Sequence, residues 1–318
     1  MQRELLKILG LAAGGLILNE IFTNDKKNYN DMANTHLQFL KFEQNISLTP
    51  TKKAKLIASR RALQDRIVNY FKLYTNLPVP KFYIQGSYKM NTMVLANDGT
   101  YDVDLGIYFL ADPYVTSFTV QDYVKRAVLG HTTGGAEHRD KCIRVKYSGD
   151  FDIDLPVYYK PTFDKPNLAT KTTWQKSDPK ELCDWFEKQR KLKDVNGQML
   201  RLIKYFKRWA AIRAKKMPSG IAFTVWVTEN YKSNTRDDIA FYETAKAIKS
   251  ALSWGVSCRN PATPFDDFTA KLDSYQRRNF TDALDNLISE AETALKQESH
   301  LKAAAIWNTH LGSKFPVI

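Results

Sequence analysis

The stretch IQGSYKMNTMVLANDGTYDVDLGIYF, residues 84–109, places a Gly-Ser pair and an Asp-Val-Asp triplet among apolar residues. Asp102 and Asp104 are two positions apart, so in a strand both carboxylates project from the same face. Val103 and Leu105 then face the opposite, packed side. Two ionised carboxylates side by side repel each other and lose hydration unless a cation lies between them. Mg²⁺ is the natural cation, because it takes carboxylate and phosphate oxygens as ligands.

A later segment, DFDIDLPVYYK at 150–160, repeats this arrangement, because Asp152 and Asp154 also share a face. If the two strands are neighbours, three or four carboxylates converge. Such a cluster can hold two metal ions that clamp the attacking and leaving oxygens of a phosphoryl transfer. Gly86 and Ser87 end a predicted strand and open a helix. Glycine there lets the backbone approach a phosphate, and the serine hydroxyl and helix N–H groups donate to it.

Chain length, net charge and cysteine content limit the number of domains, the kinds of binding partner and the cellular compartment that fit this sequence. The 318 residues suffice for one large domain or two ordinary ones. A net charge of +13 favours polyanionic partners such as nucleic acid, nucleotides or an anionic membrane surface, with simple solubility as the alternative. The three cysteines, Cys142, Cys183 and Cys258, form no CxxC pair, which argues against a disulfide scaffold and a cysteine-rich zinc site. A reducing cytoplasm fits this usage best.

The N-terminal stretch LLKILGLAAGGLILNEIF, residues 5–22, is apolar but carries Lys7 near its start and Glu20 near its end. Its uninterrupted run, 8–18, is too short to span a bilayer as a helix. The run has the length of a signal-peptide core, but no convincing cleavage site follows it. We expect a helix that packs on the body of the protein, with a membrane or partner contact as the alternative.

Periodicity divides the rest into a mixed first half and a helical second half. Residues 51–76 have the pattern of a long amphipathic helix with one apolar stripe, formed by Leu56, Leu63, Ile67, Phe71 and Tyr74. Strand patterns occur at 81–85, 101–110, 142–147 and 150–160, with a helical pattern at 117–130. Residues 160–180 hold three prolines and no clear period, which is typical of a connection. Helical patterns follow at 181–193, 196–216, 221–231, 237–252 and 267–298.

The order of strand, Gly-Ser, Asp-x-Asp strand and later acidic strand resembles the DNA polymerase β-like nucleotidyltransferase superfamily. That superfamily has hG[GS], then hDxDh, then a third acid on a later strand. Further segments are similar to the bacterial cGAS/DncV-like nucleotidyltransferases, or CD-NTases: RLIKYFKRWA, KMPSG, NPATPFDDF and the terminal HLGSKFPVI. The resemblance runs from about residue 46 to the C-terminus.

The resemblance implies an α+β fold with two domains. The first is a polymerase β-like nucleotidyltransferase core with a mixed β-sheet, spanning 46–170 and including the long spine helix 51–76. The second is a C-terminal helical domain of the oligoadenylate-synthetase type, spanning 171–318, which closes the active-site cleft. Residues 1–45 form an N-terminal helical segment outside the resemblance.

The implied activity joins nucleoside triphosphates (ATP, GTP or pyrimidine NTPs) into a cyclic di- or trinucleotide and releases pyrophosphate. Two Mg²⁺ ions, for which Mn²⁺ can substitute, serve as cofactors. The implied setting is CBASS antiphage signalling, with a cyclic-nucleotide-activated effector and an accessory protein acting on the C-terminus as partners. The zinc ribbon with which the animal synthase grips DNA is absent from the sequence. Alternatives are a linear oligonucleotide or RNA-tailing nucleotidyltransferase, a protein-modifying nucleotidyltransferase, and a non-catalytic basic nucleic-acid-binding protein.

The resemblance also assigns residues in the metal site. Asp102 and Asp104 match the pair that binds both metals. Asp154 matches the third acid, because it directly precedes LPVY. Asp152 is left as a possible group outside the metal ligands.

The residues that match triphosphate contacts are Gln85, Gly86, Ser87, Lys204 and Ser219. Lys204 lies on a helix whose apolar stripe comprises Met199, Leu202, Ile203, Phe206 and Trp209. Arg201, Lys204 and Arg208 fall on another face, which we expect to border the phosphate-filled cleft. Gly220 stands where related animal enzymes carry an aromatic residue that stacks on a base, so the resemblance identifies no base-stacking residue.

Overall fold

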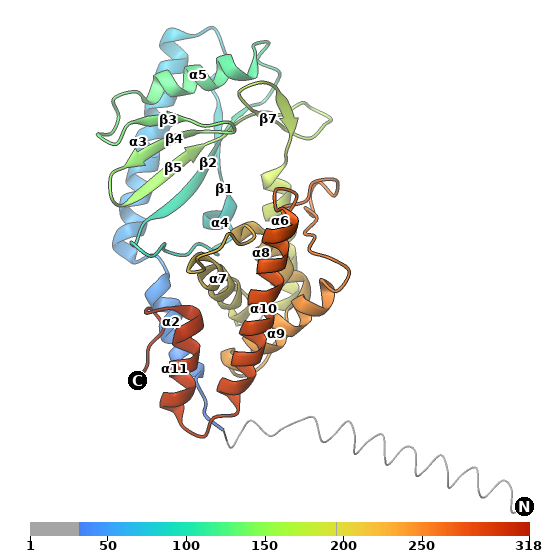
Figure 1. The fold of residues 1–318 in the computed structure, drawn as a ribbon. Coiled ribbons are helices and arrows are strands. Elements are labelled where there is room, and N and C mark those ends of the chain that lie inside the picture. Colours follow the sequence, from blue (N-terminus) through green and yellow to red (C-terminus); the bar gives the residue numbers. More distant parts are fainter. Residues whose placement is uncertain (1–31, 195) are drawn as a thin grey trace, which may run out of the picture.

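The computed structural model describes residues 32–194 and 196–318, which form a sheet-containing half and a helical half (Figure 1). The expectation for the apolar stretch 5–22 lies outside the described residues. None of the helices in the described ranges is long and apolar enough to cross a membrane.

The first half is built on one mixed sheet of eight strands, in the order β3-β4-β5-β2-β6-β7-β8, with β1 also paired to β2. The strands are β1 (Lys81–Gln85), β2 (Tyr101–Phe109), β3 (Ala136–His138), β4 (Ile143–Tyr147), β5 (Phe151–Leu155), β6 (Val157–Tyr159), β7 (Asn167–Ala169) and β8 (Trp174–Lys176). β2 is central, because it pairs antiparallel with β1 and parallel with both β5 and β6. The predicted α+β class with a mixed sheet is confirmed.

The spine helix, α3 (Pro50–Tyr74), runs along this sheet and packs against α5 (Ser117–Val128) (Figure 1). Its start is fixed by the Thr49 side chain, which accepts a hydrogen bond from the Lys52 N–H, and by Pro50 in the first turn. The apolar stripe is buried as predicted from Leu56 to Phe71. Tyr74 departs from it and is 70% exposed, because the helix ends there, beyond its packed face.

Proline divides the segment predicted as one strand at 150–160. Pro156 has no N–H to donate, and β5 ends at Leu155 before β6 begins at Val157. Each piece pairs with a different part of β2. The connection predicted at 160–180 is more ordered than expected, because it contains the short strands β7 and β8.

The second half is helical, as predicted. Its helices are α6 (Pro179–Lys193), α7 (Gln198–Ala211), α8 (Gly220–Asn230), α9 (Asp237–Ala251), α10 (Ser274–Leu295) and α11 (His300–Leu311). The apolar stripe of α7 is fully buried. The helix predicted at 267–298 starts late, because Asp273 caps α10 by accepting from the Gln276 N–H.

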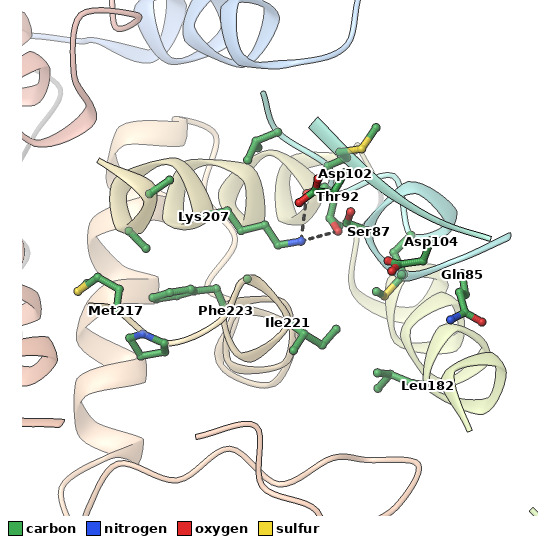
Figure 2. A pocket seen from close by; sticks show the side chains of 18 of the residues that line it. Gln85, Ser87, Thr92, Asp102, Asp104, Leu182, Lys207, Met217, Ile221 and Phe223 are labelled. Carbon is green, nitrogen blue, oxygen red and sulfur yellow. Dashed lines mark hydrogen bonds between the residues drawn. The ribbon is translucent and has the colours of Figure 1, made fainter. Parts of the chain in front are cut away.

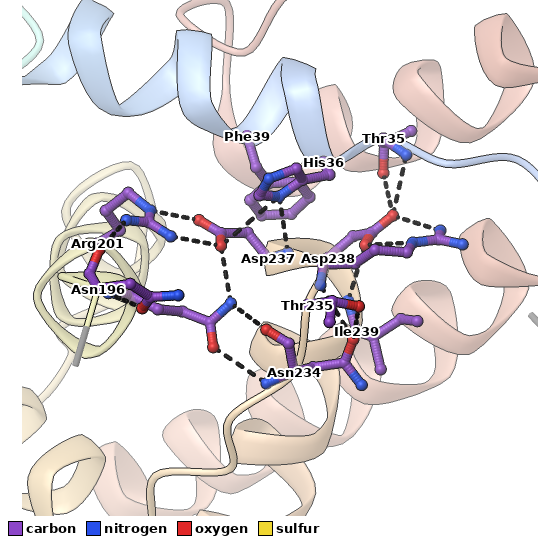
Figure 3. A network of polar contacts seen from close by, with 12 residues as sticks. Thr35, His36, Phe39, Asn196, Arg201, Asn234, Thr235, Asp237, Asp238 and Ile239 are labelled. Atoms are coloured by element: carbon purple, nitrogen blue, oxygen red, sulfur yellow. Dashed lines mark hydrogen bonds and ion pairs between the residues drawn. The ribbon is translucent and has the colours of Figure 1, made fainter. Parts of the chain in front are cut away.

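The helix α2 (His36–Ile46) precedes the core in sequence but packs in the helical half (Figure 1). Buried ionic contacts hold its N-terminal end there (Figure 3). Asp238 accepts hydrogen bonds from both the N–H and the hydroxyl of Thr35, and the Asp237 N–H donates to Nδ1 of His36. Arg201 of α7 binds the carboxylate of Asp237 at 2.7 and 2.8 Å, which ties α7 to the same end of α9. Both aspartates are fully buried, so these bonds replace the hydration that the carboxylates lose.

Candidate active site

Four carboxylates lie on one face of the central strands. In the parallel β2–β5 pair, Asp102 is opposite Asp152 and Asp104 is opposite Asp154. Residues paired in register project from the same face of a sheet. The alternate residues, such as Val103 and Ile153, are buried on the other face. The fold therefore brings together all four acids that the sequence singled out.

Arg144, on β4, lies among these carboxylates. It is the antiparallel partner of Asp154 and binds both oxygens of that carboxylate through Nε and Nη2 at 2.7 Å. Its Nη1 lies 3.1 Å from Asp152 Oδ2 and 3.4 Å from Asp102 Oδ1. The hydrogen bond to Asp154 raises the pKa of Arg144. The sequence-based reading passed over this arginine.

Asp104 carries the strongest electrostatic penalty of the four. Its burial, followed by the neighbouring charges of Asp154 and Asp102, raises the pKa of Asp104 to about 7. The pKa of Asp102 is also raised, chiefly by burial. Burial thus disfavours the ionised form of both carboxylates, and neighbouring acids add to this effect, so a bound positive ion would stabilise them.

The donor set suits a hard divalent cation, because carboxylate oxygens are the ligands that Mg²⁺ prefers. Asp102, Asp104 and Asp154 come from adjacent strands in register. Within residues 32–194 and 196–318, however, no three acidic, histidine or cysteine side chains already converge in positions that would ligate a metal. The carboxylate chemistry of Asp102, Asp104 and Asp154 nevertheless fits a site for a hard divalent cation.

The Gly-Ser pair turns the chain where β1 ends and opens the short helix α4 (Gly86–Lys89), as predicted. Gly86 has a φ of +64°, and a Cβ at this position would lie 3.2 Å from the Cγ atom of Asp104. Only glycine therefore lets the turn approach the carboxylate so closely. Gln85, before the turn, is buried, and its side chain donates to the Tyr158 hydroxyl at 3.0 Å and accepts from Tyr108 at 3.3 Å. These bonds fix the end of β1 behind the turn.

A pocket of about 920 Å³ opens between this turn and the helical half (Figure 2). Its volume lies towards the upper end of the usual range for ligand pockets. From the core it is lined by Gln85, Gly86, Ser87, Met90, Thr92, Met93, Val94, Asp102 and Asp104. From the helical half it is lined by Pro179, Leu182, Cys183, Lys207, Ala210, Ala211, Arg213, Ala214, Lys215, Lys216, Met217, Pro218, Gly220, Ile221 and Phe223. Carboxylates thus face cations across the pocket.

Lys207 is the buried cation of this pocket. Its Nζ donates to the backbone oxygen of Thr92 at 3.1 Å and to the Thr92 hydroxyl at 2.8 Å (Figure 2). Both acceptors are neutral. Burial, followed by the nearby charge of Lys204, lowers the pKa of Lys207 to about 7. An anionic ligand in the pocket would supply the counter-charge that Thr92 does not.

The structure places Lys204 elsewhere. Its Nζ bonds to the carboxylate of Glu43 on α2 and to the Ser47 hydroxyl, and it is not among the residues that line the large pocket. Arg201 and Arg208 do not line the pocket either: Arg201 pairs with Asp237, and Arg208 is buried. The expectation that this face of α7 borders the cleft is therefore corrected, because almost every side of α7 is packed against other elements. Sequence reasoning missed Lys207, one turn further along.

Ser219 lies at the edge of the pocket. It precedes α8 and is exposed, and its side chain makes no capping hydrogen bond to the helix. Its neighbours Pro218 and Gly220 both line the pocket. A Cβ at Gly220 would meet only the aliphatic part of Lys207, at ordinary contact distances of 3.5–3.8 Å.

The raised pKa of Asp104 predicts that the metal-free protein loses stability as pH rises. The folded pKa of about 7 lies above the ordinary value of 3.8, so between these values the folded state keeps a proton that the unfolded state has released. Each step up in pH within this window favours unfolding, and the loss is complete above pH 7. In EDTA, we expect the melting temperature of Asp104→Asn to exceed that of the wild type by a margin that grows from about pH 5 to about pH 8. A constant margin would contradict the assigned shift.

Comparison with known proteins agrees with this architecture. Residues 80–158 match the family profile described as the nucleotidyltransferase domain of cyclic GMP-AMP synthase DncV-like proteins. Over 233 residues the chain is 34% identical to a cyclic GMP-AMP synthase of Escherichia albertii, an alignment covering 69% of this chain and 52% of that protein. The chain thus spans about half the length of this relative.

Solved structures share the fold over nearly the whole described chain. The Vibrio cholerae DncV cyclic AMP-GMP synthase matches with a TM-score of 0.76 at 18% identity, covering 89% of this chain and 97% of that one. The Bradyrhizobium diazoefficiens CD-NTase CdnG, solved in complex with GTP, matches with a TM-score of 0.72 at 14% identity, covering 87% and 95%. Residues 80–158 therefore form a nucleotidyltransferase domain of the DncV-like family, within a chain that has the fold of DncV.

Proposed function

We propose that this protein is a cyclic oligonucleotide synthase, which joins nucleoside triphosphates into a cyclic di- or trinucleotide and releases pyrophosphate. The observation that carries the proposal is the large pocket, where Asp102 and Asp104 face Ser87 and Lys207. Carboxylates that suit a metal and donors that suit phosphate meet in one space. The sequence relationship to a cyclic GMP-AMP synthase supports the cyclic product.

We assign Asp102, Asp104 and Asp154 as ligands for two Mg²⁺ ions, with Asp152 outside the ligand set. These carboxylates would hold the ions, whose positive charge would stabilise the α-phosphate and the departing pyrophosphate. The in-register strands β2 and β5 fix the spacing of the three acids. A pocket of about 920 Å³ has room for a donor and an acceptor nucleotide beside these acids, where an acceptor ribose hydroxyl could meet the α-phosphate in line with the bond to pyrophosphate.

We propose that the triphosphate is contacted from two sides of the pocket, by the Gly86-Ser87 pair of the core and by residues of the helical half. Ser87 donates its hydroxyl, and Gly86 leaves room for phosphate oxygens near Asp104. We propose Lys207 for the role that the resemblance gave to Lys204, because Lys207 reaches the pocket and Lys204 pairs with Glu43. Ser219, at the start of α8, is proposed as a further contact.

Replacing Lys207 with methionine is expected to lower kcat/KM for nucleotide transfer by about 10²-fold, the range for losing one group that stabilises developing negative charge. Lys204→Met is the matched control on the same helix. It removes the bond to Glu43, so it should lower the melting temperature while changing kcat/KM far less. Initial rates and melting curves of both variants check this. Equal kinetic losses, or a larger loss in Lys204→Met, would return the role to Lys204.

Product analysis tests the proposed function. The purified chain is incubated with Mg²⁺ and four α-labelled nucleoside triphosphates, then with phosphatase, and the products are separated. A cyclic product keeps its label after phosphatase treatment, because every phosphate lies in a diester bond. Labelled linear oligonucleotides would instead support a linear or tailing transferase, and labelled protein would support a protein-modifying enzyme.

The proposal extends, through the same resemblance, to antiphage signalling. In that setting the product activates an effector, and an accessory protein acts on the C-terminus of the chain. Expression of the chain with a product-activated effector should then protect cells from phage, and the Asp102→Ala/Asp104→Ala variant should not.

A further inference from the structure

The guanidinium of Arg144 occupies the centre of the acidic cluster. It lies between the third carboxylate, Asp154, and the two acids nearest it, Asp152 and Asp102. The strand register fixes this position, because β4 places Arg144 directly opposite Asp154. The side chain is only 13% exposed, so its charge is directed at these acids more than at solvent. Arg144 therefore supplies a positive charge to three of the four carboxylates, Asp102, Asp152 and Asp154.

This contact competes with the site that a metal needs. Arg144 engages both oxygens of Asp154 in a planar fork, the geometry in which a carboxylate is held most firmly. Its Nη1 reaches towards Asp102, so the guanidinium stands where a cation shared by Asp154 and Asp102 would lie. In keeping with this, no ligating set of three side chains is already formed in the described part of the chain.

We propose that Arg144 is an exchangeable internal counter-ion, a positioning residue that neutralises the acidic cluster before metal arrives and must release Asp154 for the metal site to close. The inference rests on the proposed function. Without such a cation, four carboxylates on adjacent strands would repel one another and destabilise β2 and β5. With it, the metal-free sheet is stable, and metal binding includes the cost of breaking the Arg144–Asp154 pair.

Exchange of Arg144 for a metal ion and simple support of Asp154 by Arg144 predict opposite changes in metal affinity. If Arg144 competes with the metal, its removal should tighten metal binding while weakening the metal-free fold. If Arg144 merely supports Asp154 as a ligand, removal should weaken both. Arg144→Gln removes the charge and leaves a shorter, neutral amide that cannot form the fork to Asp154. Arg144→Lys keeps the charge but loses the planar fork, so it should fall between Arg144→Gln and the wild type.

The test is Mn²⁺ binding to the full nucleotide-free chain, followed through the electron paramagnetic resonance signal of free Mn²⁺. We expect Arg144→Gln to bind about tenfold more tightly than the wild type, the effect of about one charge-assisted hydrogen bond. Its melting temperature in EDTA should be lower, and Mn²⁺ should raise it by more than in the wild type. The control is Arg126→Gln, which removes an exposed arginine that pairs with Asp122 on α5 and should leave Mn²⁺ binding unchanged.

Unchanged or weaker Mn²⁺ binding in Arg144→Gln would overturn the inference. If that variant does not fold, Arg144→Lys decides alone, because tighter binding supports exchange and equal or weaker binding refutes it. Product formation separates this inference from the proposed function. A wild type that makes product while Arg144→Gln binds Mn²⁺ no more tightly refutes only the inference. A wild type that binds Mn²⁺ but makes no oligonucleotide refutes the function.

Discussion

Asp104→Asn is expected to abolish nucleotide transfer while raising the melting temperature of the metal-free protein. The amide removes a carboxylate that burial and two neighbouring acids hold at a pKa of about 7, so the folded state loses a repulsive charge. It also weakens a proposed metal ligand, since an amide oxygen carries no charge and binds a divalent cation less tightly than a carboxylate does. We expect a rate loss of about 10³-fold or more, the upper range for removing one group that stabilises transition-state charge. Initial rates and melting curves in EDTA measure both effects.

The matched control for this prediction is Asp122→Asn on α5, where the partly exposed carboxylate pairs with the exposed Arg126. It should leave the rate unchanged and the stability within about 0.5 kcal/mol of the wild type, as is usual for surface substitutions. Retained activity in Asp104→Asn would remove Asp104 from the catalytic site. A lower melting temperature with lost activity would mean that Asp104 stabilises the fold, contrary to its electrostatic surroundings.

Gly86→Ala has the second-largest expected effect. Its Cβ would overlap the Asp104 carboxylate, lying 3.2 Å from Cγ, and the left-handed φ of +64° disfavours any side chain there. Either the turn or the carboxylate must move, and a displacement of about 1 Å at a reacting centre can cost about 10²-fold in rate. We expect at least that loss in kcat/KM. The backbone strain should also cost about 1–2 kcal/mol of stability.

Gly130→Ala separates these two causes. Gly130 has a φ of +70°, but a Cβ there would meet nothing within 4 Å. This variant should therefore lose stability to a similar extent and keep its activity. If Gly86→Ala retained full activity, the Gly-Ser turn would not position Asp104 or phosphate in the way described.

Much of the core and its acids could be predicted from local pattern. A period of two places Asp102 with Asp104 and Asp152 with Asp154 on one face, and the same period buries Val103 and its neighbours. The position of Arg144 was also within reach. The segments CIRVKY and FDIDL flank the short connection SGD, and a hairpin there sets Arg144 against Asp154. Predicting this pair requires the register of β4 against β5, which follows from the length of the connection and not from composition or periodicity.

The helical wall of the pocket was harder to predict. In an amphipathic helix, the polar residues mark the side that faces solvent. Because α7 is buried on nearly all sides, its polar residues do not show which side faces the pocket. Lys204 and Lys207 differ by one turn, and only tertiary packing sends one to Glu43 and the other to Thr92. The pocket itself joins segments more than one hundred residues apart, from Gln85 to Phe223. Local sequence patterns do not predict which distant segments come together to line a pocket.

The most direct test of the central claim is the intact mass of the product, measured before any phosphatase treatment. The purified chain is incubated with Mg²⁺ and all four nucleoside triphosphates, beside the Asp102→Ala/Asp104→Ala variant. The account predicts a wild-type product whose mass equals two or three nucleoside monophosphates less one water per linkage, with one pyrophosphate released per nucleotide joined. The variant should make none. A wild type whose products all keep a terminal triphosphate, with no cyclic mass beside them, or the same cyclic mass from the variant, would contradict it.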